Sequence, residues 1–158
     1  MAPHSRLNHV AMSVPAHVLD ESSRADILAF YGEVFGWSEQ ALDEPGNPLV
    51  IRVGLEPTQF VFVQPDSDDA MRPGHMDHFG VEVDSEEAVD EILAAARQFQ
   101  QQDSRVEIVD KQTVRTSSAE SAFDYHTINC DIRFILPLMV EVQHFGQSKF
   151  LDADVPFR

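Results

Sequence analysis

Cysteine is nearly absent from this 158-residue sequence, which contains only Cys130. An internal disulfide is therefore impossible, and a cytoplasmic protein is the simplest expectation. No apolar stretch approaches the roughly 18 residues that a membrane-spanning helix needs. The first six residues also lack the apolar core of a signal peptide. These absences exclude a disulfide-stabilised fold and give no indication of a membrane protein.

Basic residues are also scarce, because 11 Lys and Arg stand against 27 Asp and Glu, for a formal net charge of −16. A surface with this charge repels phosphates, so neither nucleic acids nor anionic membranes are expected as partners. Hydrophobic residues make up 43% of the chain and charged residues 24%, the balance of an ordinary globular domain. The length fits one domain, or two small halves that share one core.

One segment of the sequence occurs twice. Residues 7–14 read LNHVAMSV and residues 76–83 read MDHFGVEV, and the two align without a gap. Each segment alternates between large apolar side chains and smaller or polar ones, which predicts a β-strand. In both strands the histidine, His9 or His78, is expected on the face opposite the large apolar residues.

A similar order of elements follows each repeated strand. The spacing of apolar residues predicts one helix over 22–36 and another from Asp84 or Ser85 to about Gln102. Short extended segments, separated by residues typical of turns, follow each helix. They are expected near residues 38–43, 49–55, 59–64, 105–116, 122–129 and 133–144. The last turn is expected near Asp131.

The sequence therefore predicts an α+β fold with two βαβββ units in a single domain. The first unit covers residues 6–65, the second covers residues 75–145, and residues 66–74 form a linker rich in Asp, Pro and Ser. Residues 146–158 follow as a C-terminal tail. We expect the two units to form a curved, eight-stranded mixed sheet, whose faces away from the helices enclose one cavity.

The two repeated histidines are candidate metal ligands. His9 and His78 would converge across the cavity if the units pair by pseudo-twofold symmetry. The last predicted strand adds Glu141, a lone carboxylate among apolar residues. Burial of an unpaired carboxylate is costly, so a cation or strong hydrogen-bond donors are expected beside it. Two imidazoles and one carboxylate leave coordination positions open, as a catalytic divalent metal requires.

This pattern resembles the vicinal-oxygen-chelate superfamily, which includes glyoxalases, bleomycin-resistance proteins and extradiol dioxygenases. The resemblance covers nearly the whole chain and rests on one histidine in the first strand of each unit, His9 and His78, and on Glu141 in the final strand. It implies one divalent metal ion, which could be Fe, Mn, Ni, Co or Zn. It also implies a small-molecule substrate whose oxygen atoms bind the metal, and a homodimer.

The resemblance implies two kinds of enzyme and leaves both open. Glyoxalase-like lyases and isomerases carry a fourth ligand, Glu or Gln, in the last strand of the first unit. Here the corresponding residue is Val61 or Phe62, and Gln59 or Gln64 could substitute if the register shifts. A three-ligand site is instead similar to that of extradiol dioxygenases, which are usually longer proteins.

Extradiol dioxygenases of this group also place a His and a Tyr beside the metal. The segment 123–127 reads FDYHT and offers both types, but neighbouring residues of a strand face opposite ways. At most one of them can enter the cavity, and His126 is the candidate acid or base.

A metal-free binding protein is the rival interpretation. Bleomycin-resistance proteins use the same fold to sequester a ligand without a catalytic metal. Their acidic pockets suit cationic drugs, and this chain is acidic as well. Metal analysis of the purified protein distinguishes this drug-binding class from the metal-dependent dioxygenase or lyase class.

Overall fold

The computed structural model describes residues 7–41, 47–116 and 125–146. The predicted tail therefore lies outside the described residues apart from Gly146. Neither helix of the described part has the length and apolar character needed to cross a bilayer. The elements in chain order are β1 (His9–Val14), the 3₁₀ helix η1 (Ala16–Leu19), α1 (Glu21–Phe35), β2 (Ser38–Glu39), β3 (Leu49–Arg52), β4 (Phe60–Pro65), β5 (His78–Glu82), α2 (Glu86–Gln100), β6 (Glu107–Thr116), β7 (Tyr125–Arg133) and β8 (Met139–Phe145).

In the described residues the strands form two four-stranded sheets with the same internal order. The first sheet has the order β1-β4-β3-β2 and the second has the order β5-β8-β7-β6. In both sheets the first strand of the unit pairs in parallel with the last, and the other neighbours pair antiparallel. The prediction of an α+β fold with two βαβββ units is confirmed.

The helix ends follow from local sequence. Asp20 caps α1 by accepting a hydrogen bond from the backbone N–H of Ser23 at 2.8 Å. Gly36 ends α1 in the left-handed region, with φ 69°, which glycine adopts without steric cost. Ser85 caps α2 in the same way as Asp20 caps α1, through the backbone N–H of Ala88. These ends fix where each helix lies along its sheet.

The last turn lies further along the chain than the sequence suggested. Strand β7 continues to Arg133, and residues 134–138 form the turn into β8. Asp131 is therefore a strand residue, opposite Glu141 in the β7–β8 ladder, and the predicted turn at Asp131 is wrong. Polar and apolar side chains alternate without interruption through this part of β7, as they do in a strand with one polar face.

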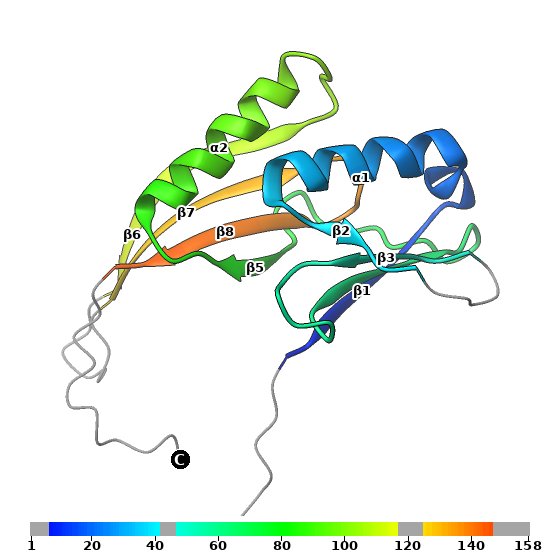
Figure 1. Ribbon diagram of the computed structural model, residues 1–158, viewed down its shortest axis with the longest axis horizontal. Helices are drawn as coiled ribbons and strands as arrows, with labels where there is room; N and C mark the ends of the chain where they lie inside the picture. The colour runs from blue at the N-terminus through cyan, green and yellow to red at the C-terminus, as the bar shows by residue number, and fades with distance from the viewer. Residues whose placement is uncertain (1–6, 42–46, 117–124, 147–158) are drawn as a thin grey trace, which may run out of the picture.

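The two halves share one hydrophobic core. Phe30 of α1 packs against Phe99 of α2 and Phe134 of the last turn, with ring centroids 5.1 and 4.6 Å apart. The buried Tyr31 hydroxyl donates a hydrogen bond to the Phe134 carbonyl at 3.3 Å. Both helices lie on the same side of the molecule, with the sheets below them (Figure 1). The sheet faces away from the helices are therefore left for a site.

Candidate functional site

His78 and Glu141 lie side by side on one face of the second sheet. β8 runs parallel to β5 and pairs Gly80 with Glu141, so the carboxylate lies one strand away from His78. Nε2 of His78 is 3.2 Å from Oε2 of Glu141. This face is opposite the one whose residues Val140 and Val142 pack into the core. The His78 side chain is 43% exposed, so a ligand can reach it.

Hydrogen bonding determines which nitrogen of His78 faces the carboxylate. Nδ1 donates to the Met76 carbonyl at 2.8 Å, so the neutral ring presents the lone pair of Nε2 to Glu141. A lone pair and a carboxylate oxygen repel each other at this distance unless a proton or a metal cation lies between them. The Met76 carbonyl, followed by the charge of Glu141, raises the pKa of His78. The pair is therefore suited to hold a positive charge.

Two residues of β7 complete the surroundings of Glu141. Asn129 donates from Nδ2 to Oε1 of Glu141 at 2.7 Å, which leaves Oε2 directed at His78. Asp131 lies opposite Glu141 and is buried. Burial, followed by the negative charge of Glu141, raises the pKa of Asp131. Neither residue was among the predicted site residues, because the turn predicted at Asp131 interrupts the polar face of β7.

His9 belongs to the other half. Its Nδ1 donates to Oδ1 of Asn8 at 2.9 Å, and its ring stacks on Phe60 with centroids 5.0 Å apart. It lines a cavity of about 360 Å³, together with other residues of β1, β4 and β5. No group of three or more His, Cys, Asp or Glu in the described residues is placed to hold a metal. The structure thus brings His78 and Glu141 together without His9.

Gly80 lies between this cavity and Glu141. It lines the cavity and is the ladder partner of Glu141. A Cβ atom at this position would lie 3.1 Å from Oε1 of Gln143 and 3.9 Å from Oε2 of Glu141. Glycine therefore leaves room for the Gln143 amide, whereas the Glu141 carboxylate would remain at an ordinary van der Waals distance from an added Cβ.

The register of β4 shows which residue occupies the position of a fourth ligand. Val61 is buried in the core, whereas Phe62 pairs with Ala11 and shares its face. Of the two glutamines considered as substitutes, Gln59 lines the cavity and Gln64 is exposed near the end of the strand. An aromatic ring therefore replaces a carboxylate at the centre of this strand.

His126 is not brought to this site. It lies five residues before Asp131 on β7, so strand alternation places it on the face opposite Glu141. Its ring lies against Gly146, where an added Cβ would collide with it. The acid or base role predicted for His126 has no geometric basis on the face that carries His78.

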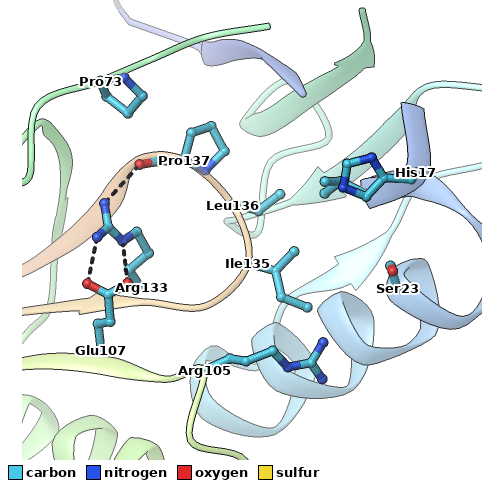
Figure 2. A pocket seen from close by; sticks show the side chains of 10 residues that line it. His17, Ser23, Pro73, Arg105, Glu107, Arg133, Ile135, Leu136 and Pro137 are labelled. Carbon is cyan, nitrogen blue, oxygen red and sulfur yellow. Dashed lines mark hydrogen bonds and ion pairs between the residues drawn. The ribbon is translucent and has the colours of Figure 1, made fainter. Parts of the chain in front are cut away.

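A second, larger cavity of about 610 Å³ lies between the start of α1 and the turn after β7 (Figure 2). Arg133 on its wall donates to Glu107 and to the Pro137 carbonyl. Arg105 pairs with Asp26 at 2.6 Å and also with Asp103. Both guanidinium groups are thus neutralised by carboxylates. None of the three predicted metal ligands lines this cavity.

Comparison with known proteins supports the fold. No protein-family model and no curated protein sequence matches the chain significantly. The fosfomycin resistance protein FosX from Listeria monocytogenes has a TM-score of 0.55 and 15% identity, over 92% of this chain and 96% of that one. Lactoylglutathione lyase from Agrobacterium tumefaciens has a TM-score of 0.54 and 18% identity, over 90% and 96%. A glyoxalase family protein from Bacillus anthracis has a TM-score of 0.55 and 15% identity, over 92% and 99%.

The likeness spans nearly the whole of each chain and therefore includes both units. At these identities the comparison establishes the fold. The chain has the fold of the vicinal-oxygen-chelate superfamily, as expected from the repeated strands of His9 and His78.

Proposed function

We propose that this protein is a divalent-metal-dependent enzyme that acts on a small, oxygen-bearing substrate. His78 and Glu141 hold the metal, and His9 completes the ligand set. One observation carries the proposal: Nε2 of His78 faces Oε2 of Glu141 at 3.2 Å, while Met76 and Asn129 bind the other nitrogen and the other oxygen. Metal-binding histidines commonly donate their second N–H to a carbonyl or carboxylate in this way.

The donor atoms fit the proposed metal. An imidazole nitrogen beside a carboxylate oxygen suits Fe(II), Mn(II), Co(II), Ni(II) or Zn(II). When bound, such a metal supplies Lewis acidity that polarises a substrate oxygen. The protein's own contribution is to orient Glu141 through Asn129, to fix the ring of His78 through Met76, and to form an apolar cavity wall with residues such as Phe79.

Two reaction classes fit the proposed site. The structural neighbours include a lactoylglutathione lyase, so lyase or isomerase chemistry is compatible with this fold. The aromatic residue Phe62 stands where a fourth ligand would be expected, and a three-ligand site favours dioxygenase chemistry. The identity of the metal separates the classes, because oxygen activation requires a redox-active metal such as iron or manganese.

His9 can complete the site within one chain or from a second copy in a homodimer. We propose the first arrangement, because β1, β4 and β5 of one chain line the same cavity. A mixing experiment tests it: His9→Ala and His78→Ala chains are unfolded together and refolded. Recovery of metal binding in the mixture would place the site between chains, since only a mixed dimer could then hold an intact ligand set. Gel filtration tests the homodimer itself.

Elemental analysis of the protein as isolated, followed by titration with Co(II), tests the metal. We expect about one metal per chain, lost in His78→Ala and in Glu141→Ala. His75→Ala is the matched control, because His75 is exposed three residues before His78. Absence of bound metal in the wild type, with no stabilisation by added Fe, Mn, Ni, Co or Zn, would refute the proposal.

A second candidate is a small-molecule binding protein without a metal. The observation in its favour is that the described residues of one chain bring together only two of the three ligands. A protonated His78 would then satisfy Glu141 as an ion pair, and the cavity of about 360 Å³ would hold the ligand. This candidate would be supported if cationic organic ligands raised the melting temperature and added divalent metals did not change it.

A further inference from the structure

Asn129 has one amide atom bound and the other without a partner. The side chain is 6% exposed, and Nδ2 donates to Oε1 of Glu141 at 2.7 Å. A carboxylate oxygen only accepts hydrogen bonds, so the amide nitrogen must face Glu141 and the amide oxygen must point elsewhere. That oxygen, Oδ1, is buried and has no hydrogen-bond partner among the described residues.

A buried acceptor without a donor is unfavourable. Such groups are rare in folded proteins, because each one loses its hydrogen bonds to water without replacement. Oδ1 of Asn129 also lies beside the predicted metal ligand Glu141, and not in a remote part of the core. An unpaired acceptor at this place is available to a hydrogen-bond donor of a ligand.

The position of Oδ1 restricts the chemistry of that ligand. Oδ1 and Nδ2 belong to the same planar amide, so the unpaired acceptor Oδ1 lies next to the nitrogen that donates to Glu141. Gln143 is the ladder partner of Asn129, and its side chain lies beside Gly80, which lines the cavity. A donor that reaches Oδ1 must therefore be close to the group held by Glu141.

We infer that Asn129 is a positioning residue with two roles: Nδ2 orients Glu141 toward the metal, and Oδ1 accepts a hydrogen bond from the substrate. The substrate then belongs to a class of small molecules with an N–H or O–H donor directly beside the oxygen that binds the metal. This inference rests on the proposed metal site.

The first test needs no metal. In the ¹H–¹⁵N spectrum of the metal-free protein, the side-chain amide of Asn129 should exchange slowly with water. The signal should be missing in Asn129→Leu, should exchange rapidly in Glu141→Ala, and should persist in Thr127→Val. Thr127 is a matched control because it is equally buried on the same face of β7. Rapid exchange in the wild type would overturn the inference whether or not the protein binds metal.

The second test measures Co(II) affinity and the visible spectrum of the Co(II) protein. Asn129→Leu should weaken binding by about tenfold or more and change the spectrum, because the carboxylate is no longer oriented. Thr127→Val should change neither. If Asn129→Leu does not fold, Asn129→Ala provides the same comparison. Absence of Co(II) binding in the wild type, with a protected amide, would refute the metal function and reduce Asn129 to a structural partner of Glu141.

The third test uses two ligands of the Co(II) protein that differ in one donor. Acetohydroxamic acid and N-methylacetohydroxamic acid both bind a metal through two oxygen atoms, but only the first carries an N–H beside them. The wild type should prefer the first by about tenfold. The preference should disappear in Asn129→Leu and Asn129→Ala. Equal affinities in a wild type that binds Co(II) would overturn the acceptor role of Oδ1.

Discussion

Asp131 and Glu141 lie directly opposite each other in the β7–β8 ladder, on the face that also carries His78. The negative charge of Glu141 disfavours ionisation of the carboxyl group of Asp131 opposite it. Burial and the charge of Glu141 together raise the pKa of Asp131, and the charge of His78 opposes this effect only in part. On this face, two carboxyl groups, Asp131 and Glu141, therefore lie near the imidazole of His78.

Replacing Asp131 by Asn should stabilise the protein above neutral pH. The pKa of Asp131 is raised on folding, so the folded state keeps a proton that the unfolded state releases, and the free energy of unfolding falls as pH rises above the unfolded pKa. Asp131→Asn should therefore gain about 1 kcal/mol at about pH 8 and nothing at about pH 3. Urea denaturation at both pH values measures this. Asp68→Asn, in an exposed loop, is the control.

His78 should give opposite pH dependences for stability and for metal binding. Its pKa is raised on folding by the Met76 carbonyl and by Glu141, so its contribution to stability is complete below about pH 6.5 and is lost as pH rises through the folded pKa. Urea denaturation of the metal-free protein should show this loss, and His78→Asn should not. Co(II) affinity should increase over the same range, because the proton competes with the metal. This account would be contradicted if the free energy of unfolding and the Co(II) affinity changed in the same direction as pH rises.

Truncating Phe30 should unfold both halves together. Phe30 contacts Phe99 and Phe134, so Phe30→Ala should cost about 3–5 kcal/mol and keep a single transition by circular dichroism and by tryptophan fluorescence. Tyr31→Phe, which removes only the bond to the Phe134 carbonyl, should cost about 1 kcal/mol. Leu55→Ala is the control, since Leu55 is almost fully exposed.

Gly32 in α1 and Gly36 at its C-terminal end should respond in opposite ways to replacement by alanine. Gly36→Ala should cost about 1 kcal/mol, because φ is 69° there and no atom lies near the added Cβ, so the cost comes from the backbone alone. Gly32 lies inside the helix, where an added Cβ would lie 3.4 Å from the Trp37 carbonyl oxygen, at the short end of van der Waals contact, so Gly32→Ala should gain roughly 0.5 kcal/mol. Thermal unfolding of both variants measures the difference. Equal effects would mean that the left-handed helix end is absent in solution.

The repeated histidine strands predicted the fold because alternation fixes which face of a strand each side chain occupies. The same rule placed His78 and Glu141 on one face before their distance was known. The residue pattern did not predict the last turn correctly, because residues 134–138 are apolar and all but Pro137 pack in or against the core. Turns are usually recognised by polar residues and glycine. Ile135 even adopts a positive φ of 59° there.

The position of His9 relative to the other two predicted ligands could not be derived from strand patterns. It depends on the angle at which the two sheets meet, and contacts between helices distant in sequence, such as Phe30 with Phe99, set that angle. Similarly, Asn129 became recognisable only when β7 was seen to continue past it and to face Glu141.

The aromatic contact between Phe30 and Phe134 links the duplicated units through one core, so we expect the two units to unfold together. A ligand that binds only to the second sheet should then raise the free energy of unfolding of the first sheet as well, because the two unfold together. Occupancy of one half would therefore slow hydrogen exchange in α1, far from the ligand, without any change in the backbone of that helix.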